Sequence, residues 1–200
     1  MQQEARALMP GLRKEERLTK RIAGRFLLAL LCVAACSQKS GDRYDKNVSV
    51  PKGDPDFPAL TTSWVIDRVG VLSAPAVAEG DAICEKLKTD GVAEVVVVLI
   101  SGVKQPEEWA THYGRWLGLG RKGLSTEGGN KGLVWLIRPD AKEKITISVG
   151  RGLPDFSTVD YGPIIDNAVE YFNFDNYDKG TATLIAQTDQ VLRRMKSDRK

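Results

Sequence analysis

Three oxygen-bearing side chains stand at the ends of predicted strands and helices, where they could hold a metal ion. Asp67 ends the first predicted strand, Asn130 comes just before the apolar run 132–137, and Asp160 lies at the start of a late helix. Strand-end oxygens that meet across a sheet suit Ca²⁺, which takes about six to eight oxygen ligands. Asp and Asn also cap helices and turns routinely, and spacing alone favours that interpretation. The sequence therefore offers a candidate Ca²⁺ site and a structural alternative to it.

No local arrangement of residues supports nucleophilic catalysis. Cys84 lies beside Ile83 and Leu87, which predicts a buried, inert thiol, because a reactive thiolate needs a cationic neighbourhood. A cysteine phosphatase also needs an arginine in the loop that follows its cysteine, and the corresponding position here is Asp90. The single histidine, His112, lies in the middle of a predicted helix between tryptophans, which is typical of a packed or solvated helix position. The catalytic residues of any enzyme activity are therefore unknown from the sequence.

Nucleotides and nucleic acids are not expected partners. The segment GLGRKG, residues 118–123, has the spacing of a dinucleotide-binding fingerprint, but it follows a predicted helix instead of a strand. The chain has 29 basic and 26 acidic residues, a net charge of +3. Residues 1–36 contain seven of the basic and three of the acidic residues, which leaves 22 basic and 23 acidic in the remainder, a net charge of −1. Binding to nucleic acid requires clustered positive charge, and the remainder has none in excess. No cofactor other than the possible Ca²⁺ is predicted.

Residues 1–35 have the organisation of a bacterial signal peptide. Seven basic residues precede the uncharged apolar run 26–35, and Met9 is an alternative start to Met1. A membrane-spanning helix needs roughly 20 apolar residues, so this run is too short to cross a bilayer. A basic segment followed by a short apolar core is instead typical of a secretory signal.

The signal ends in a lipoprotein motif. The sequence VAAC, residues 33–36, matches the bacterial lipobox, in which small residues precede a cysteine whose thiol carries the lipid. We predict that Cys36 becomes the lipidated first residue of the mature protein and anchors it to the membrane. Ser37, which follows, favours the outer membrane of the cell envelope, facing the periplasm. The alternatives are an ordinary signal cut near Ala35 and an apolar segment that is not cleaved.

The mature chain has a tether and one folded domain. Residues 36–60 are polar and rich in proline and glycine, which predicts a flexible tether from the lipid. Residues 61–196 are enough for a single domain with its own core. Once Cys36 is acylated, Cys84 is the only thiol left, so no intramolecular disulfide is possible.

The folded part alternates strand and helix patterns and then ends in two helices. The continuous apolar runs 93–100 and 132–137 predict central strands that are buried on both faces. The run 145–149 alternates apolar and polar residues, which predicts a strand with one wetter face. Ser73 and Gly91 have the types expected at the start and just after the end of the first helix. The order predicts an α/β fold with a single mixed sheet sandwiched between helices.

Several segments of the chain together resemble the TPM domain. They occur in the order typical of that family: VIDRVGVLS (65–73), WATHYGRWLGLG (109–120), NKGLVWLI (130–137), ITISVGRGLP (145–154) and FDNYDKG (174–180). The family includes bacterial membrane-associated and secreted proteins, plant thylakoid proteins and an animal receptor modulator. The resemblance covers roughly residues 61–195, and it implies a sheet between helices, as the residue patterns also do.

The resemblance also implies possible Ca²⁺ binding at loops on one edge of the sheet. Asp67 matches the family's aspartate after the first strand, and Asp160 matches less securely. Asn130 stands in the family's Asp-Asn-Gly region, but Gly129 replaces the leading acid and Lys131 adds a cation, which weakens the calcium inference. Acid phosphatase activity has been attributed to plant members, but no catalytic constellation accompanies the motifs. Many members have a C-terminal transmembrane helix, whereas this chain ends in polar residues and would depend on its lipid.

The sequence thus favours a lipid-anchored TPM-domain protein that acts as a non-enzymatic binding or accessory module for another envelope protein, which is unidentified. The main alternative is a weak, Ca²⁺-linked acid phosphatase, and a third is a structural lipoprotein whose metal site stiffens its loops. An enzyme should show a pocket where several acids converge with an open metal position. A binding module should show an exposed apolar patch. The four tryptophans could contribute to such a patch, although packing in the core is the commoner use.

Overall fold

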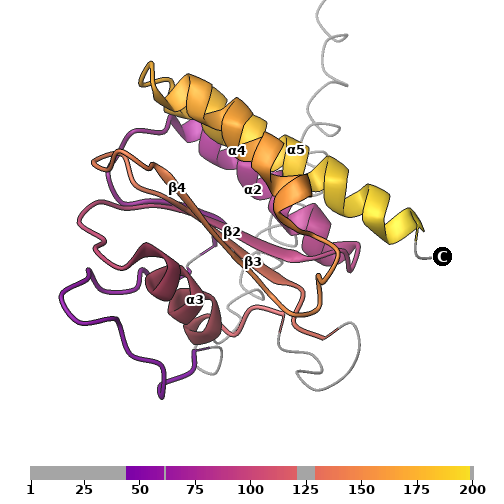
Figure 1. Cartoon of the computed structure of the whole chain (residues 1–200), viewed down its shortest axis with the longest axis horizontal. Coiled ribbons are helices and arrows are strands. Elements are labelled where there is room, and N and C mark those ends of the chain that lie inside the picture. Colours follow the sequence, from indigo (N-terminus) through magenta and orange to yellow (C-terminus); the bar gives the residue numbers. More distant parts are fainter. Residues whose placement is uncertain (1–43, 61, 121–128, 199–200) are drawn as a thin grey trace, which may run out of the picture. The chain divides into compact units, whose positions relative to one another are not determined.

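The structure is a computed structural model of the chain, and it describes residues 44–60, 62–120 and 129–198. The predicted signal peptide and Cys36 lie outside these residues. Within them, four strands form one mixed sheet in the order β1-β2-β3-β4, with four helices against it (Figure 1). Strands β1, β2 and β3 are parallel, and β4 is antiparallel to β3. The elements are β1 (Val65–Asp67), α2 (Ala74–Thr89), β2 (Glu94–Leu99), α3 (Pro106–Trp116), β3 (Gly132–Ile137), β4 (Ile145–Val149), α4 (Thr158–Phe172) and α5 (Tyr177–Asp198).

The order of elements and the mixed α/β sheet confirm the fold predicted from the sequence. Strands β3 and β4 have the predicted bounds, and β2 is one residue shorter at each end than the apolar run 93–100. All residues of β3 and all but the first of β2 are buried. A strand that is covered on both faces must be apolar throughout, which is why these two segments show no alternation.

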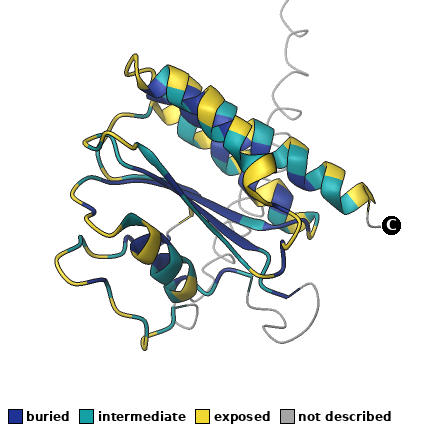
Figure 2. Ribbon diagram, viewed as in Figure 1, coloured by how far each residue is buried: buried dark blue, intermediate teal, exposed yellow. Residues whose placement is uncertain are grey.

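Helices cover both faces of the sheet. Helices α2, α4 and α5 lie on one face, and α3 lies on the other (Figure 1). Figure 2 shows the buried residues concentrated in the strands and on the inward sides of the helices. Trp135 of β3 is fully buried, and its Nε1 donates to Thr188 Oγ1 of α5 at 3.2 Å. Trp64 and Trp109 are also buried and Trp116 is half-buried, so the tryptophans serve mainly the core.

The first helix begins and ends where the sequence predicts. The Ser73 hydroxyl accepts a hydrogen bond from the Ala76 amide at 3.3 Å and so caps the start of α2. Gly91 follows the helix with φ of 63°, a left-handed conformation that glycine adopts without steric cost. In the described part of the chain, no helix combines the length and the apolar character that crossing a bilayer requires.

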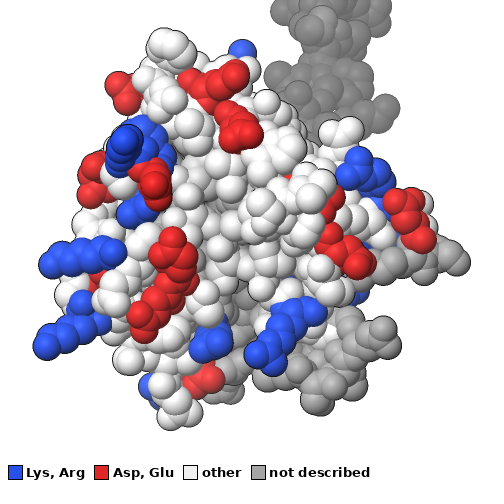
Figure 3. Space-filling view, in the orientation of Figure 1, with Lys and Arg blue, Asp and Glu red and all other residues white. Residues whose placement is uncertain are grey.

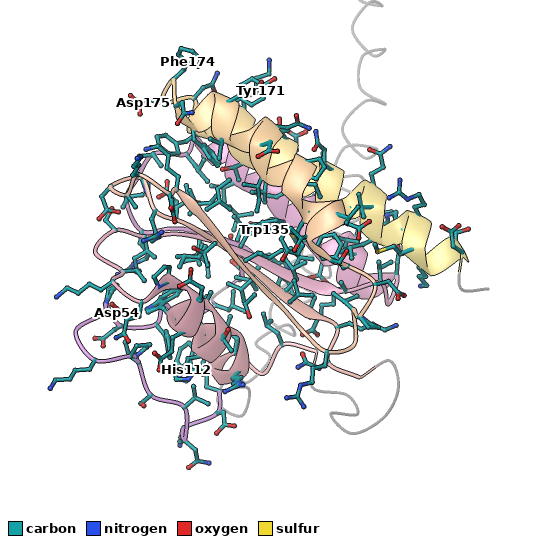
Figure 4. The ribbon with its side chains drawn as sticks, in the orientation of Figure 1. Asp54, His112, Trp135, Tyr171, Phe174 and Asp175 are labelled. Carbon is teal, nitrogen blue, oxygen red and sulfur yellow. The ribbon has the colours of Figure 1, made fainter. Side chains whose placement is uncertain are left out.

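The predicted flexible tether, residues 36–60, needs a correction. Residues 44–60, here called the strap, pack against α3 and belong to the folded domain. The Asp54 carboxylate accepts hydrogen bonds from the amides of Lys104 (2.7 Å) and Gln105 (3.3 Å), just before α3 begins. The strap also supplies a backbone carbonyl, from Ser49, that lies 3.2 Å from His112 Nδ1. Figure 4 shows Asp54 near the start of this helix and His112 further along it.

Aromatic side chains explain why a polar, proline-rich segment is ordered. Trp109 Nε1 and Tyr113 Oη of α3 donate to the carbonyls of Pro55 (2.9 Å) and Pro58 (2.8 Å). Proline has no backbone N–H group, so a proline-rich segment seldom pairs with a strand, and its carbonyl groups need other donors. Here the side chains of α3 supply these donors. The stacking extends to the first described residue, because Tyr44 lies parallel to Trp116 with ring centroids 4.2 Å apart. The folded domain therefore includes residues 44–60 in addition to the predicted range 61–196.

Candidate functional site

Asp67, the first predicted metal ligand, holds a turn. Its carboxylate accepts hydrogen bonds from the amides of Val69 (2.9 Å), Gly70 (2.8 Å) and Leu72 (2.7 Å). Three amide donors close the loop between β1 and α2 and leave few lone pairs directed elsewhere. The structure therefore supports the turn-capping interpretation of this residue.

Asp160, another predicted ligand, belongs to a helix cap. Its carboxylate accepts from both the amide and the hydroxyl of Ser157 at 3.1 Å, which completes a capping box at the start of α4. Its other oxygen lies 3.9 Å from the Arg194 guanidinium on α5. This carboxylate also has a structural role.

The three predicted ligands are not brought together at one edge of the sheet. Asp67 lies level with Leu99, whereas Gly132 lies level with Glu94, five residues away along β2, which is about 17 Å. Asn130 comes before β3 and Asp67 is the last residue of β1. Because these strands are parallel, the two residues lie at opposite ends of the strands. Across residues 44–60, 62–120 and 129–198, no three His, Cys, Asp or Glu side chains are grouped to hold a metal ion. The structure therefore places Asp67 and Asn130 apart and does not bring them to one site.

Cys84 is buried, as the sequence predicts. Its side chain is fully enclosed between α2 and the sheet, and burial raises the pKa of the thiol from 9.0 to about 12, with a smaller contribution from the negative charges of Asp81 and Asp189. The raised pKa keeps the thiol neutral, so Cys84 is not a nucleophile at physiological pH.

We expect the Cys84 thiol to react with iodoacetamide at pH 8 about a thousand-fold more slowly in the folded protein than in urea, because only the thiolate reacts. The measurement is mass spectrometry of a variant with Cys32 and Cys36 replaced by serine. The stabilisation from the neutral thiol is complete below pH 9.0 and is lost as the pH rises toward 12. Equal rates in folded and unfolded protein would contradict the burial of this residue.

A cluster of charged side chains joins helices α2 and α5 and has a structural role. Asp90, at the end of α2, accepts from Lys86 Nζ at 2.9 Å and from Arg193 Nη1 of α5 at 2.6 Å. These two hydrogen bonds hold the pKa of Asp90 below its ordinary value, and the same contact with Asp90 raises the pKa of Arg193. Lys196 adds a bond to the carbonyl of Asp90. The cluster fixes the last turn of α2 to α5.

One pocket stands out as a candidate site. Its volume is about 500 Å³, and it lies between α3, the start of β3, the end of β4 and the strap. Gly114 of α3 contributes to the pocket by presenting no side chain where helix and sheet approach. The polar residues that line it come from all four of these segments: Asp45, Thr111, Arg115, Asn130, Ser148 and Arg151.

The pocket is suited to binding an anion. Arg115 and Arg151 are both exposed, and within the described part of the chain no hydrogen bond or ion pair engages either guanidinium. Arginine presents a planar set of donors that matches a carboxylate or phosphate group. Two hydroxyl groups, Thr111 Oγ1 and Ser148 Oγ, lie 3.2 Å apart deeper between helix and strand. Among the described residues, Asp45 is the one carboxylate that lines the pocket, and they show no converging acids of the kind expected in a metal-dependent phosphatase.

Asn130 is the one predicted site residue that lines this pocket. Its φ is 56°, and its backbone bonds to the Gly120 carbonyl (2.7 Å) and the Gly152 amide (3.0 Å), which fixes the loop before β3. The two arginines cannot be found from the sequence, because Arg115 and Arg151 lie far apart in the chain and in no local motif. The polar face predicted for residues 145–149 was the one available signal, since Ser148 lies on it.

The expected exposed apolar patch is also missing from the described residues. The large exposed apolar side chains there are Val71 (37 %), Val159 (85 %) and Phe174 (86 %), which come from different elements. Figure 4 places Phe174 beside Asp175 and Tyr171 at the turn between α4 and α5. Single exposed apolar residues are common and mark no site by themselves.

Comparison with known proteins gives one family and several solved structures, among them the following two. The model of the TPM domain family matches residues 65–191. The N-terminal domain of a protein from P. gingivalis is 21 % identical with a TM-score of 0.55, and the match covers 66 % of this chain and 82 % of that one. The N-terminal domain of the cg2496 protein from Corynebacterium glutamicum is 17 % identical with a TM-score of 0.47, covering 72 % and 86 %. No curated protein matches the chain. The first structure supports the fold alone.

Proposed function

The chain belongs to the TPM domain family, and we propose that it serves as a non-enzymatic binding module for another protein of the bacterial cell envelope. The observation that carries this proposal is the pocket between α3 and β4, with two guanidinium groups that no described residue engages. Unpaired arginines at the mouth of a pocket are suited to recognition, because they present donors without first having to break an internal ion pair.

The positions of the carboxylates favour binding over hydrolysis. Asp67 and Asp160 each accept several hydrogen bonds within turns and caps, so these two carboxylates stabilise local backbone. A metal-assisted phosphatase would need such groups free and directed at a common point. No specific contact in the structure favours the phosphatase alternative over the binding module.

The second part of the proposal is a lipid anchor on Cys36, which rests on the lipobox of residues 33–36. The anchor would hold the domain at the outer membrane, facing the periplasm. Replacing Cys36 with serine should move the protein from the membrane fraction to the soluble fraction, because lipid attachment begins at the thiol of this one residue. The measurement is fractionation with fatty-acid labelling, beside Cys84→Ser as a control that retains the label. Membrane retention of unlabelled Cys36→Ser protein would rule out this anchor.

Docking at the pocket is tested by site-specific crosslinking in living cells. A photoreactive amino acid at Val48, which lines the pocket, should yield a discrete crosslinked product. The same group at Val159, which is 85 % exposed on α4, is the matched control and should not give that product. The product should disappear when Arg115 and Arg151 are both changed to glutamine. A pattern that is the same at Val48 and Val159 would contradict the proposed function.

A further inference from the structure

Strand β4 forms one edge of the sheet, and half of its backbone groups point away from β3. The Gly150 amide donates to the Gly132 carbonyl (2.8 Å), and the Arg138 amide donates to the Lys144 carbonyl (2.7 Å). In an antiparallel ladder, the residues midway between such bonded pairs direct their N–H and C=O groups to the other side. With the register of β3 and β4, these residues are Ile145, Ile147 and Val149.

This edge lacks the features that usually protect a free strand. Natural edges are interrupted by charged residues, prolines or bulges, and residues 145–149 contain no charged residue and no proline. Among the described residues, no backbone hydrogen bond from another segment engages the outward groups of Ile145, Ile147 and Val149. In Figure 3 the middle of the face, where β3 and β4 lie in Figure 1, is largely free of charge, and charged side chains surround it. The edge is therefore open to another extended chain.

The free edge leads into the pocket. Val149, the last residue with outward backbone groups, lines the pocket, and Arg151, two residues later, lines it as well. Arg115 approaches the same pocket from α3. The geometry points to an extended segment of a partner protein that pairs with β4 as a fifth strand and places a carboxylate in the pocket, against Arg115 and Arg151. Backbone pairing would supply affinity and the carboxylate would set register, as in other cases of strand addition.

This inference deepens the proposed function, on which it rests, by naming the chemistry of the partner. Arg115 and Arg151 line the pocket from two separate parts of the chain, and a guanidinium group pairs well with a carboxylate, so we expect a bound carboxylate to contact both. The carboxylate can be an acidic side chain or the C-terminus of the partner. Both present the same planar pair of oxygens, and the probe peptides described below distinguish them.

Charge favours an acidic segment over a second copy of this chain. A second copy would offer its own β4, whose residues 145–149 carry no carboxylate. Lys144 directly precedes this strand and Arg151 follows it by two residues, and the nearest acid in the sequence is Glu143 in the preceding turn. An acidic strand would instead complement the positive end of the edge. Self-pairing is an outcome of the test and would overturn the inference.

The test uses the purified lipoprotein in detergent micelles and a fluorescein-labelled hexapeptide of alternating threonine and valine that ends in glutamate. Fluorescence anisotropy should give a dissociation constant below about 1 mM. Arg151→Gln and Arg115→Gln should each weaken binding by about tenfold, which is the loss of one charge-assisted contact. Arg68→Gln, at an exposed position near the opposite edge of the sheet, is the matched control and should bind like the original protein.

Modified peptides separate the two parts of the inference. Methylation of alternate peptide nitrogens should abolish binding when it removes the donors that face β4, and should have little effect in the other register. A peptide with a glutamine side chain and a free C-terminus, beside one with glutamate and an amidated C-terminus, identifies which carboxylate is bound. The peptide that keeps the bound carboxylate should retain its affinity, and the double loss should weaken binding about tenfold.

The inference would be overturned if the peptide did not bind at a concentration of about 1 mM. Equal effects of Arg151→Gln and Arg68→Gln on binding would also overturn it, and so would unchanged binding after methylation in both registers. Sedimentation that shows dimers dissociated by the peptide would assign the edge to a second copy and would also overturn it. These failures are distinct from failure of the proposed function. Crosslinking at Val48 that depends on both arginines would leave the binding module standing, with a partner that does not add a strand.

Discussion

Replacing Trp135 with alanine should lower the free energy of unfolding by about 3–5 kcal/mol, the range for removal of a large side chain from a packed core. Trp135 is fully buried in the middle of β3, where Figure 4 shows it between the helical layers. The change leaves a cavity that surrounding strands and helices cannot close, because each is fixed by its own hydrogen bonds. It also leaves Thr188 without its indole partner. Urea denaturation followed by circular dichroism measures the loss.

Two further variants divide this effect into its parts. Trp135→Phe keeps most of the apolar volume and removes the hydrogen bond to Thr188, so we expect a smaller loss of about 1–2 kcal/mol. Trp116→Ala, at a half-buried position of α3, removes a similar side chain where solvent can fill the space. If Trp135→Ala cost no more than Trp116→Ala, the central position of Trp135 in the core would be wrong.

Replacing Gly120 with alanine should destabilise the domain by about 2–4 kcal/mol, from left-handed strain together with overpacking. Gly120 has φ of 64°, and a Cβ there would lie 2.5 Å from the amide nitrogens of Lys131 and Gly132 and 2.7 Å from the carbonyl carbon of Asn130. These contacts are with backbone, which cannot rotate away as a flexible side chain could. Differential scanning calorimetry would report the loss as a lower melting temperature.

Gly91 provides the matched control for Gly120. Its φ of 63° is nearly the same, but a Cβ there would meet nothing within 4 Å. Gly91→Ala should therefore show the conformational cost alone, about 1 kcal/mol. The difference between the two variants measures the close approach of the loop at Gly120 to the start of β3. Equal losses would mean that the loop can move away and that the pocket wall at Asn130 is pliant.

The sheet and its helices could be predicted because their signals are local. The valine run of β2 contains no polar residue, which indicates a strand buried on both faces. The run is short for a helix, and its β-branched residues favour a strand. Ser73 and Gly91 mark the ends of α2 through hydrogen bonds and φ values that involve only neighbouring residues.

The strap could not be predicted from its own composition. Prolines and charges in residues 44–60 are typical of a tether, and nothing in that segment shows that donors await its carbonyls. The donors belong to Trp109 and Tyr113, more than 50 residues later in the chain. Both rings are buried in the core, and their polar atoms also bind the strap.

For the candidate site too, local signals could be predicted and contacts between distant segments could not. Asp67 and Asn130 both adjoin predicted strands, which suggested a shared metal site. The parallel register shows that they lie at opposite ends of the strands, because Asp67 ends β1 and Asn130 precedes β3. Asp90 forms ion pairs that sequence spacing indicates only for Lys86, four residues away, and not for Arg193. The residues that line the pocket come from segments far apart in the sequence. Local motifs can therefore indicate single residues, but not which residues lie together in the folded chain.

The ordered strap sets how far the domain can travel from its anchor. Only seven residues, 37–43, separate Cys36 from Tyr44, and eight steps of fully extended chain span at most about 28 Å. A flexible tether of 25 residues would have allowed roughly three times that reach. If Cys36 carries the lipid, the binding surface sweeps a shallow layer over one membrane, where a short link gives an effective concentration in the millimolar range for a partner in the same membrane. Modest intrinsic affinity is then enough, and a partner embedded in the opposite membrane of the envelope lies beyond reach.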